Sequence, residues 1–322
     1  MASSITPDPA IQLFYAVCNG DADNVKSLLA RQPPPAINAK HSRDSRGFHV
    51  NSATALHIAC ERRNIEIVRI LLEKGASPHT LDGKRRTPLH LAAGARSIEI
   101  IRSLLSWVQD REGYVDLRDE QGNTPLLVAC AQPQRAGEDR NMDVLSHLLA
   151  EGADLRAINN DGETAAHRAT RDSGDLEILK YLGDNARELL GLQTIFMGRN
   201  SNTCLHLATW LGRVQHVEWL LEAMRYADIR KEDADGRTAW DIACGLRAHG
   251  TDLSSFQVSS TFAEKEGGVM DPSLQWHRIA EVGSLKTYAL WTHNVSTTTH
   301  NIAMNLLTTC VPTPSIRQYS LY

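Results

Sequence analysis

Apolar residues recur along this chain at the spacing of short, paired helices. In the segment TPLHLAAGARSIEIIRSLLSWV, Thr87 is a good helix N-cap, and Pro88 follows at the first helical position, where its missing N–H costs nothing. Small and apolar residues from Leu89 to Ala93 predict a first helix. A second helix is predicted by the 3.6-residue spacing of Ile98, Ile101, Leu104 and Leu105. Each helix is too short to be stable alone, so such pairs must stack on neighbours.

Near-copies of the same seven letters return through most of the chain. The words TALHIAC, TPLHLAA, TPLLVAC, TAAHRAT, TCLHLAT and TAWDIAC begin at Thr54, Thr87, Thr124, Thr164, Thr203 and Thr238. The intervals between these threonines are 33, 37, 40, 39 and 35 residues, which a base period of 33 with insertions explains. Self-similarity at a fixed period of this size indicates a stacked repeat architecture.

Tight turns precede the threonines, as DEQGNT at Asp119, NNDGET at Asn159 and DADGRT at Asp233 show. Together with the Thr-Pro-Leu-His word and the two short helices, these turns make the chain resemble the ankyrin repeat. The resemblance covers roughly residues 8–250. It implies an all-α fold, an ankyrin-repeat solenoid of stacked helix pairs with hairpin fingers along one edge, which we assign to residues 1–250.

The ends and the insertions depart from this pattern. Residues 8–31 lack the Thr-Pro opening and are predicted to be an N-terminal capping repeat. Extra residues fall after residue 31, after Trp107, between the two helices of the Thr124 unit, and before Thr203. Beyond the solenoid we expect a linker at 251–272, a degenerate repeat or capping helix at 273–294, and a disordered tail at 295–322.

Composition narrows the classes of function. The chain has 322 residues, 42% of them hydrophobic, and a net charge of −4 without a dominant basic block. These values argue against direct nucleic-acid binding. The sequence has no secretory signal and no apolar run of membrane-spanning length, so we expect a soluble, monomeric, cytoplasmic or nuclear protein that is not secreted.

The residues that could carry chemistry are best explained by the repeat itself. His57, His90, His167 and His206 share one repeat position, and the predicted role of each imidazole is to bond backbone in its own turn region. Cys60, Cys130 and Cys244 share another position that a small buried residue fills, and no metal-ligand spacing is present. We therefore predict no catalytic, cofactor or metal site, and no cofactor.

The resemblance places partner binding on the concave face, which fingers and first helices form. The residues we select there are Trp210, Leu211, Glu61, Arg62, Arg171, Lys84, Arg85, Arg86, Asp161 and Asp235. Trp210 and Leu211 form an apolar pair typical of a binding hot spot, and packing under the finger with Phe196 or Ile195 is the alternative. Basic finger tips come early and acidic tips late, so we expect a groove polarised along its length.

The function that follows is a non-enzymatic scaffold for protein–protein interaction. One refinement is a transcription coregulator recruited by a DNA-binding partner. A substrate adaptor of a degradation complex is one alternative. Another is an enzyme that uses the insert-rich or C-terminal segment, where His277, Asp271 and Glu281 are titratable but share no recognisable spacing.

Overall fold

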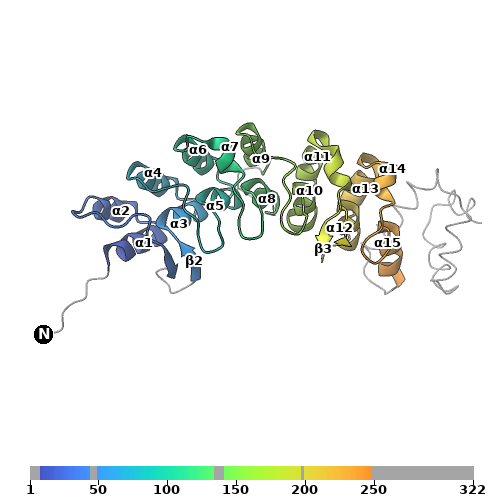
Figure 1. Cartoon of the computed structure of the whole chain (residues 1–322), viewed down its shortest axis with the longest axis horizontal. Helices are drawn as coiled ribbons and strands as arrows, with labels where there is room; N and C mark the ends of the chain where they lie inside the picture. Colours follow the sequence, from blue (N-terminus) through green and yellow to red (C-terminus); the bar gives the residue numbers. More distant parts are fainter. Residues whose placement is uncertain (1–7, 44–48, 134–140, 197–198, 249–322) are drawn as a thin grey trace, which may run out of the picture.

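Helix pairs stack side by side into a curved array in the computed structural model, which describes residues 8–43, 49–133, 141–196 and 199–248. The first helices form one layer (Figure 1): α1 Pro9–Asn19, α3 Ala55–Glu61, α5 Pro88–Gly94, α8 Pro125–Cys130, α10 Ala165–Arg168, α12 Cys204–Trp210 and α15 Ala239–Ala248. The second helices form the other layer: α2 Ala22–Leu29, α4 Ile65–Glu73, α6 Ile98–Ser106, α9 Asn141–Ala150, α11 Leu176–Asn185 and α13 Val214–Ala223.

The array curves toward the side on which the first helices and the fingers lie, so these elements form its concave face (Figure 1). The solenoid of helix pairs predicted from the sequence is therefore confirmed, and α1 with α2 forms the first helix pair, within the residues for which we predicted a capping repeat. The expectations for residues 251–272, 273–294 and 295–322 lie outside the described residues.

Each first helix begins where the sequence predicts. The threonines before α3, α5, α8, α10 and α12 have extended backbone, and each is the N-cap of its helix. Small residues such as Ala92 and Ala93 are fully buried on the first helix, which lets neighbouring helices approach closely. The second helices add larger side chains such as Ile100, Ile101 and Leu104, so one continuous core runs through the stack.

The insertions form local structure at the edges of the array. The first becomes the antiparallel pair β1 His41–Arg43 and β2 His49–Ala53, and the residues after Trp107 include the short helix α7 Arg111–Val115. Before Thr203 the chain forms a 3₁₀ helix, η2 Arg187–Gly191, and a second small pair, β3 Ile195–Phe196 with β4 Arg199–Asn200. One further short helix, α14 Tyr226–Ile229, follows α13.

The Thr164 repeat contains a π-helix, η1 Ala169–Ser173, which the sequence did not predict. Its cause is one added residue. Leu176, the first residue of α11, lies 12 positions after Thr164, whereas Ile65 and Ile98 lie 11 positions after Thr54 and Thr87. A π-helical turn absorbs a single inserted residue without breaking the helix.

Candidate protein-binding surface

The four repeated histidines join each repeat to the finger that follows it. In His90, Nδ1 accepts the backbone N–H of Thr87 at 3.1 Å and lies 2.9 Å from the Thr87 hydroxyl. Since Nδ1 accepts, Nε2 carries the proton and donates to the carbonyl of Asn123, at 3.0 Å. His57, His167 and His206 make the same contacts, to the carbonyls of Arg86, Asn202 and Arg237. The sequence predicted only the contacts within the turn and missed the bond to the next finger.

These contacts use both ring nitrogens, so no lone pair or N–H remains for catalysis. Burial lowers the pKa of all four histidines, to about 4 for His57 and His167. Each ring is therefore neutral at pH 7. In the Thr238 repeat, Asp241 replaces the histidine. Its carboxylate accepts the Thr238 N–H at 2.9 Å, as histidine Nδ1 accepts the threonine N–H in the repeats that have the histidine.

The cysteines of the described residues fill core positions. Cys18, Cys60, Cys130 and Cys204 are buried free thiols, and burial raises the pKa of Cys130 and Cys204 to about 12. Such thiols stay protonated at neutral pH and are poor metal ligands or nucleophiles. Across the part of the chain that the structure describes, no three His, Cys, Asp or Glu residues are placed to hold a metal ion.

One carboxylate or amide side chain organises each tight finger. Asp82 Oδ1 accepts the backbone N–H groups of Lys84 and Arg86, both at 2.9 Å. Asp119, Asn159 and Asp233 make the equivalent pairs of bonds in their own fingers. The residues between these anchors are held outward on a fixed backbone, and they include the exposed Lys84, Arg85, Asp161 and Asp235.

Two other charged residues selected for partner binding, Arg86 and Arg62, are engaged within the chain. Arg86 is half-buried and pairs with Asp82, at 2.7 Å. Arg62 donates to the carbonyl of Cys18 in the capping repeat. Glu61 beside it is exposed.

Arg171 belongs to a network at the end of η1. It pairs with Asp172, at 2.9 Å, and with Glu163, and Arg168 contacts the same two carboxylates. These contacts fix the guanidinium groups of the predicted surface rather than leaving them free to move.

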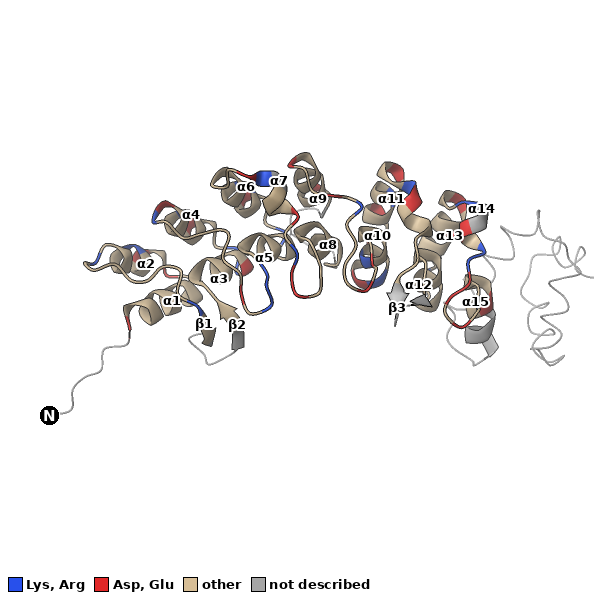
Figure 2. Ribbon diagram, in the orientation of Figure 1, with Lys and Arg blue, Asp and Glu red and all other residues tan. Residues whose placement is uncertain are grey.

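The predicted polarity along the groove is weaker than the sequence suggested. The finger before α5 carries basic residues and the finger before α8 carries acidic ones (Figure 2). At the far end, however, Arg237 pairs with both Asp233 and Asp235, at 2.9 and 2.8 Å, so the acidity of that finger is partly neutralised. The predicted polarity was based on the residues at the finger tips, and Arg237 lies outside the tip, so its pairing was not included.

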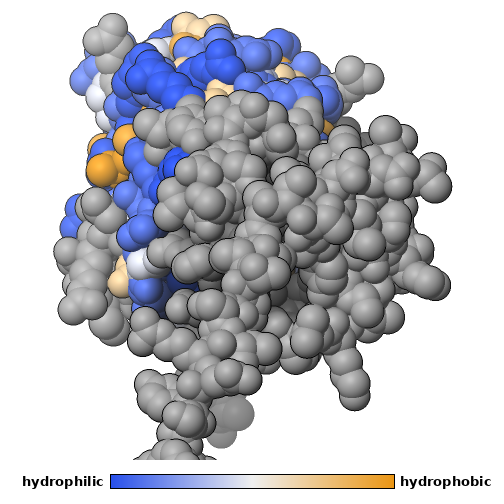
Figure 3. All heavy atoms as spheres, turned by 90° about the vertical axis from the view of Figure 1, so that its right-hand side faces the viewer, coloured by the Kyte–Doolittle hydropathy of each residue, from blue (hydrophilic) through white to orange (hydrophobic). Residues whose placement is uncertain are grey.

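Trp210 and Leu211 are exposed, as a contact surface requires. Their exposed fractions are 66% and 43%, and in the described residues they are the only adjacent pair of large exposed apolar side chains. Trp210 is the most exposed large apolar side chain among the described residues. Seen end-on, most of the visible described surface is hydrophilic, with hydrophobic residues in small patches (Figure 3). An apolar pair on such a surface is typical of a partner-binding site.

The match to known families agrees with this architecture. A family described as ankyrin repeats matches three stretches of the chain, residues 13–112, 74–139 and 134–233. Because these stretches together span well over half of the sequence, the chain belongs to the ankyrin repeat family. Members of this family are protein-interaction scaffolds built on extended concave surfaces, and their repeat domains are in general non-catalytic.

Much longer proteins share the repeats. The chain is 28% identical over 212 residues to human transient receptor potential cation channel subfamily A member 1, a match that covers 65% of this chain and 17% of the channel. It is 29% identical over 199 residues to human SH3 and multiple ankyrin repeat domains protein 2, covering 60% of this chain and 10% of that protein. A third relative is the E3 ubiquitin-protein ligase KEG of Arabidopsis thaliana, 28% identical over 158 residues, which cover 49% of this chain and 9% of the ligase.

The chain therefore spans less than a fifth of the length of these relatives. A search of the described helices finds none that is both long and apolar enough to cross a membrane.

Proposed function

We propose that the concave face binds a partner protein, and that Trp210 and Leu211 at the end of α12 are the centre of the contact. The observation that carries this proposal is the exposure of the pair, at a repeat position that the resemblance to ankyrin repeats assigns to the concave face. The corresponding residues in earlier repeats are polar or small, as in Glu61–Arg62 and Gly94–Ala95. An exposed tryptophan gains more free energy on desolvation than any of these residues.

The scaffold that presents the pair is rigid. The Thr203 repeat is fixed to the next finger by His206, whose Nε2 donates to the carbonyl of Arg237 at 3.1 Å. On the other side, Arg213 donates to the carbonyl of Arg171 at 3.1 Å. Binding to a surface that is already ordered loses little conformational entropy, which favours affinity.

Affinity capture from the native cell, with quantitative mass spectrometry, tests the proposal. The variant Trp210→Ala/Leu211→Ala is compared with Trp107→Ala, which removes another exposed tryptophan, 53% exposed, from the end of α6 in the other helix layer. A hot-spot residue contributes about 2 kcal/mol, or roughly 30-fold in affinity. A partner retained by Trp107→Ala and lost by the double variant supports the proposal. Equal capture by wild type and the double variant refutes it.

A narrower proposal is that this partner is a DNA-binding protein and that the chain acts as a transcription coregulator in the nucleus. Its alternative is a substrate adaptor of a degradation complex, for which the likeness to the repeats of an E3 ubiquitin-protein ligase gives some support. The identity of the captured partner distinguishes them. Exclusive cytosolic residence in the native cell would contradict the coregulator role.

A further inference from the structure

His216 breaks the pattern of the second helices. It lies in α13, three residues after Arg213, the residue that precedes the helix. The same place in the four preceding repeats holds Ile67, Ile100, Val144 and Ile178, each with 0% of its surface exposed. His216 is itself only 6% exposed, and its Nε2 is buried with no hydrogen-bond partner. A buried polar atom without a partner destabilises the fold, so its presence at an isoleucine position calls for a compensating role.

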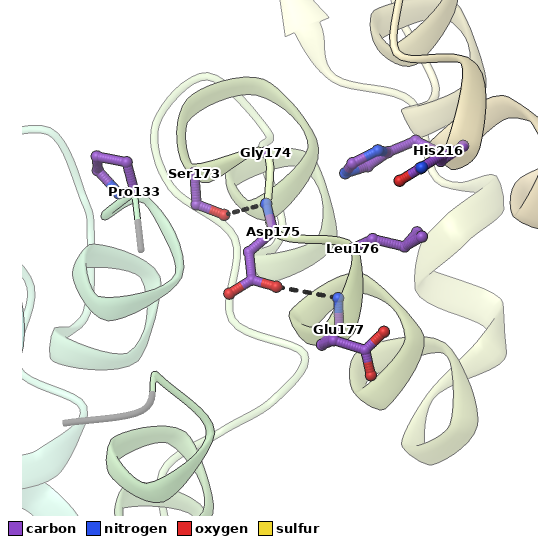
Figure 4. A pocket seen from close by; sticks show the side chains of 8 residues that line it. Pro133, Ser173, Gly174, Asp175, Leu176, Glu177 and His216 are labelled. Carbon is purple, nitrogen blue, oxygen red and sulfur yellow. Dashed lines mark hydrogen bonds between the residues drawn. The ribbon is translucent and has the colours of Figure 1, made fainter. Parts of the chain in front are cut away.

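The imidazole faces an open pocket of about 460 Å³ between the start of α11 and the start of α13 (Figure 4). Ser173, Gly174, Asp175 and Glu177 line the pocket from the η1–α11 side, and Gln215 and His216 line it from α13. Figure 4 shows the ring of His216 pointing toward Gly174 and Leu176. The π-helical turn η1 ends at Ser173, so the residue inserted between the two helices of this repeat lies directly beside the pocket. Such turns are frequent at functional sites.

Arg213 supports this arrangement from behind. It takes the place of the N-cap residues Asn64 and Asp175 of other second helices, but it makes no capping bond of its own. Its guanidinium lies against Gly174 and donates to the carbonyl of Arg171. Burial, with Arg213 nearby, lowers the pKa of His216 to about 4. The ring is therefore neutral at pH 7, and in the tautomer protonated at Nδ1 its Nε2 has a lone pair for a donor that reaches it.

The charge of the lining selects the ligand. Both ionised side chains that line the pocket are carboxylates, Asp175 and Glu177. Asp175 Oδ1 accepts the N–H of Glu177 at 3.0 Å, and Glu177 pairs with Lys180 at 3.0 Å on the outer side of the helix. The two carboxylates of the lining favour a cationic donor, and the two nearby cations are engaged elsewhere, Arg213 with the carbonyl of Arg171 and Lys180 with Glu177.

The geometry points to a recognition pocket for a lysine or arginine side chain of a partner protein, with Asp175 as the main charged contact and His216 as an acceptor. The pocket lies at the inter-helix turns and does not depend on contacts made by Trp210 and Leu211. The pocket and the Trp210–Leu211 contact can therefore be tested independently, and failure of one does not refute the other.

A small probe tests the pocket directly. Nα-acetylarginine methylamide is titrated into the full chain with ¹³C-labelled histidine, and the ring resonance of His216 is assigned with His216→Ile. Isoleucine is the repeat's own residue there, so the thermal midpoint of this variant should not fall. We expect a saturable shift with millimolar affinity. Nα-acetylcitrulline methylamide, which is similar in shape but uncharged, should bind at least about tenfold more weakly.

The matched variants are Asp175→Asn and Asp21→Asn. Both residues hold the N-cap position of a second helix, and asparagine caps as well as aspartate, so each variant removes charge and keeps the helix start. Asp175→Asn should weaken binding of the probe about tenfold, and Asp21→Asn should leave it unchanged. The proposal is overturned by the absence of a saturable shift or by equal binding of the citrulline probe. It is also overturned if Nα-acetylglutamate methylamide binds more tightly, or if Asp175→Asn has no effect.

Discussion

Replacement of His90 by leucine tests whether the repeated histidines stabilise the array by hydrogen bonding or by packing. Leucine is chosen because Leu127 fills the same position in the next repeat and is fully buried there, so the fold accepts its shape. The substitution removes the bonds to Thr87 and to the carbonyl of Asn123.

The expected loss follows from what each former partner can do. The Thr87 N–H is left without its acceptor in a residue that is 0% exposed, which costs about 1–3 kcal/mol. The carbonyl of Asn123 still accepts the N–H of Asp119 at 3.0 Å, so losing the imidazole there costs only about 1 kcal/mol. Together these give about 2–4 kcal/mol, a large fraction of the 5–15 kcal/mol that is typical of a folded domain.

Urea unfolding followed by far-ultraviolet circular dichroism measures the change, and amide hydrogen exchange at Thr87 locates it. Leu127→Met is the control, since it conserves volume and removes no side-chain hydrogen bond, and it should cost less than about 1.5 kcal/mol. If His90→Leu costs no more than the control, or if protection at Thr87 is unchanged, the histidines act by packing and the reasoning fails.

Three other predictions rest on the same structure. The pKa values of His57 and His167 fall from an ordinary 6.5 to about 4 on folding, so the unfolded chain binds protons that the folded chain cannot. The free energy of unfolding should therefore be highest above about pH 6.5 and fall by about 1.4 kcal/mol per histidine for each pH unit toward 4. A thermal midpoint that stays constant from pH 7.5 to 4.5 would contradict this. Gly75 and Gly122 both have positive φ, +87° and +77°, but a Cβ at Gly75 meets open space whereas one at Gly122 lies 2.9 Å from the backbone nitrogen of Asn160. Gly75→Ala should cost about 1 kcal/mol in chemical denaturation and Gly122→Ala clearly more, and equal costs would show that the finger adjusts freely. In a Cys244→Ser/Cys310→Ser background, the four buried thiols should resist Ellman's reagent until the chain unfolds, so rapid labelling at neutral pH would disprove their burial.

The fold could be predicted from the sequence because its signal is repeated. Thr87 caps α5 for the same local reason that Thr54 caps α3, so several copies of one word give several independent observations of one unit. The second helices were found for the same reason, since one apolar spacing recurs in each. The insertions occur once each, and nothing in the chain repeats the signal of α7 or of the β1–β2 hairpin. Such segments depend on contacts that only the folded array supplies.

The candidate sites were harder to find because a site is where a repeat differs from its neighbours. The histidines that stand out in the sequence are those that recur, such as His57 and His90. Their ring nitrogens are used in hydrogen bonds that join neighbouring repeats. His216 occurs once, at a position that holds a buried aliphatic residue in the four repeats before it, and an alignment of the second helices would have revealed it. The interval of 39 residues from Thr164 to Thr203 includes the residue that was added in η1. The sequence shows that the interval is long, but only the structure shows that the added residue forms a π-helix beside His216. In a repeat protein the shared positions specify the scaffold. Residues such as Trp210 and His216, which depart from the repeat and remain exposed or unpartnered, are therefore the places to look for function.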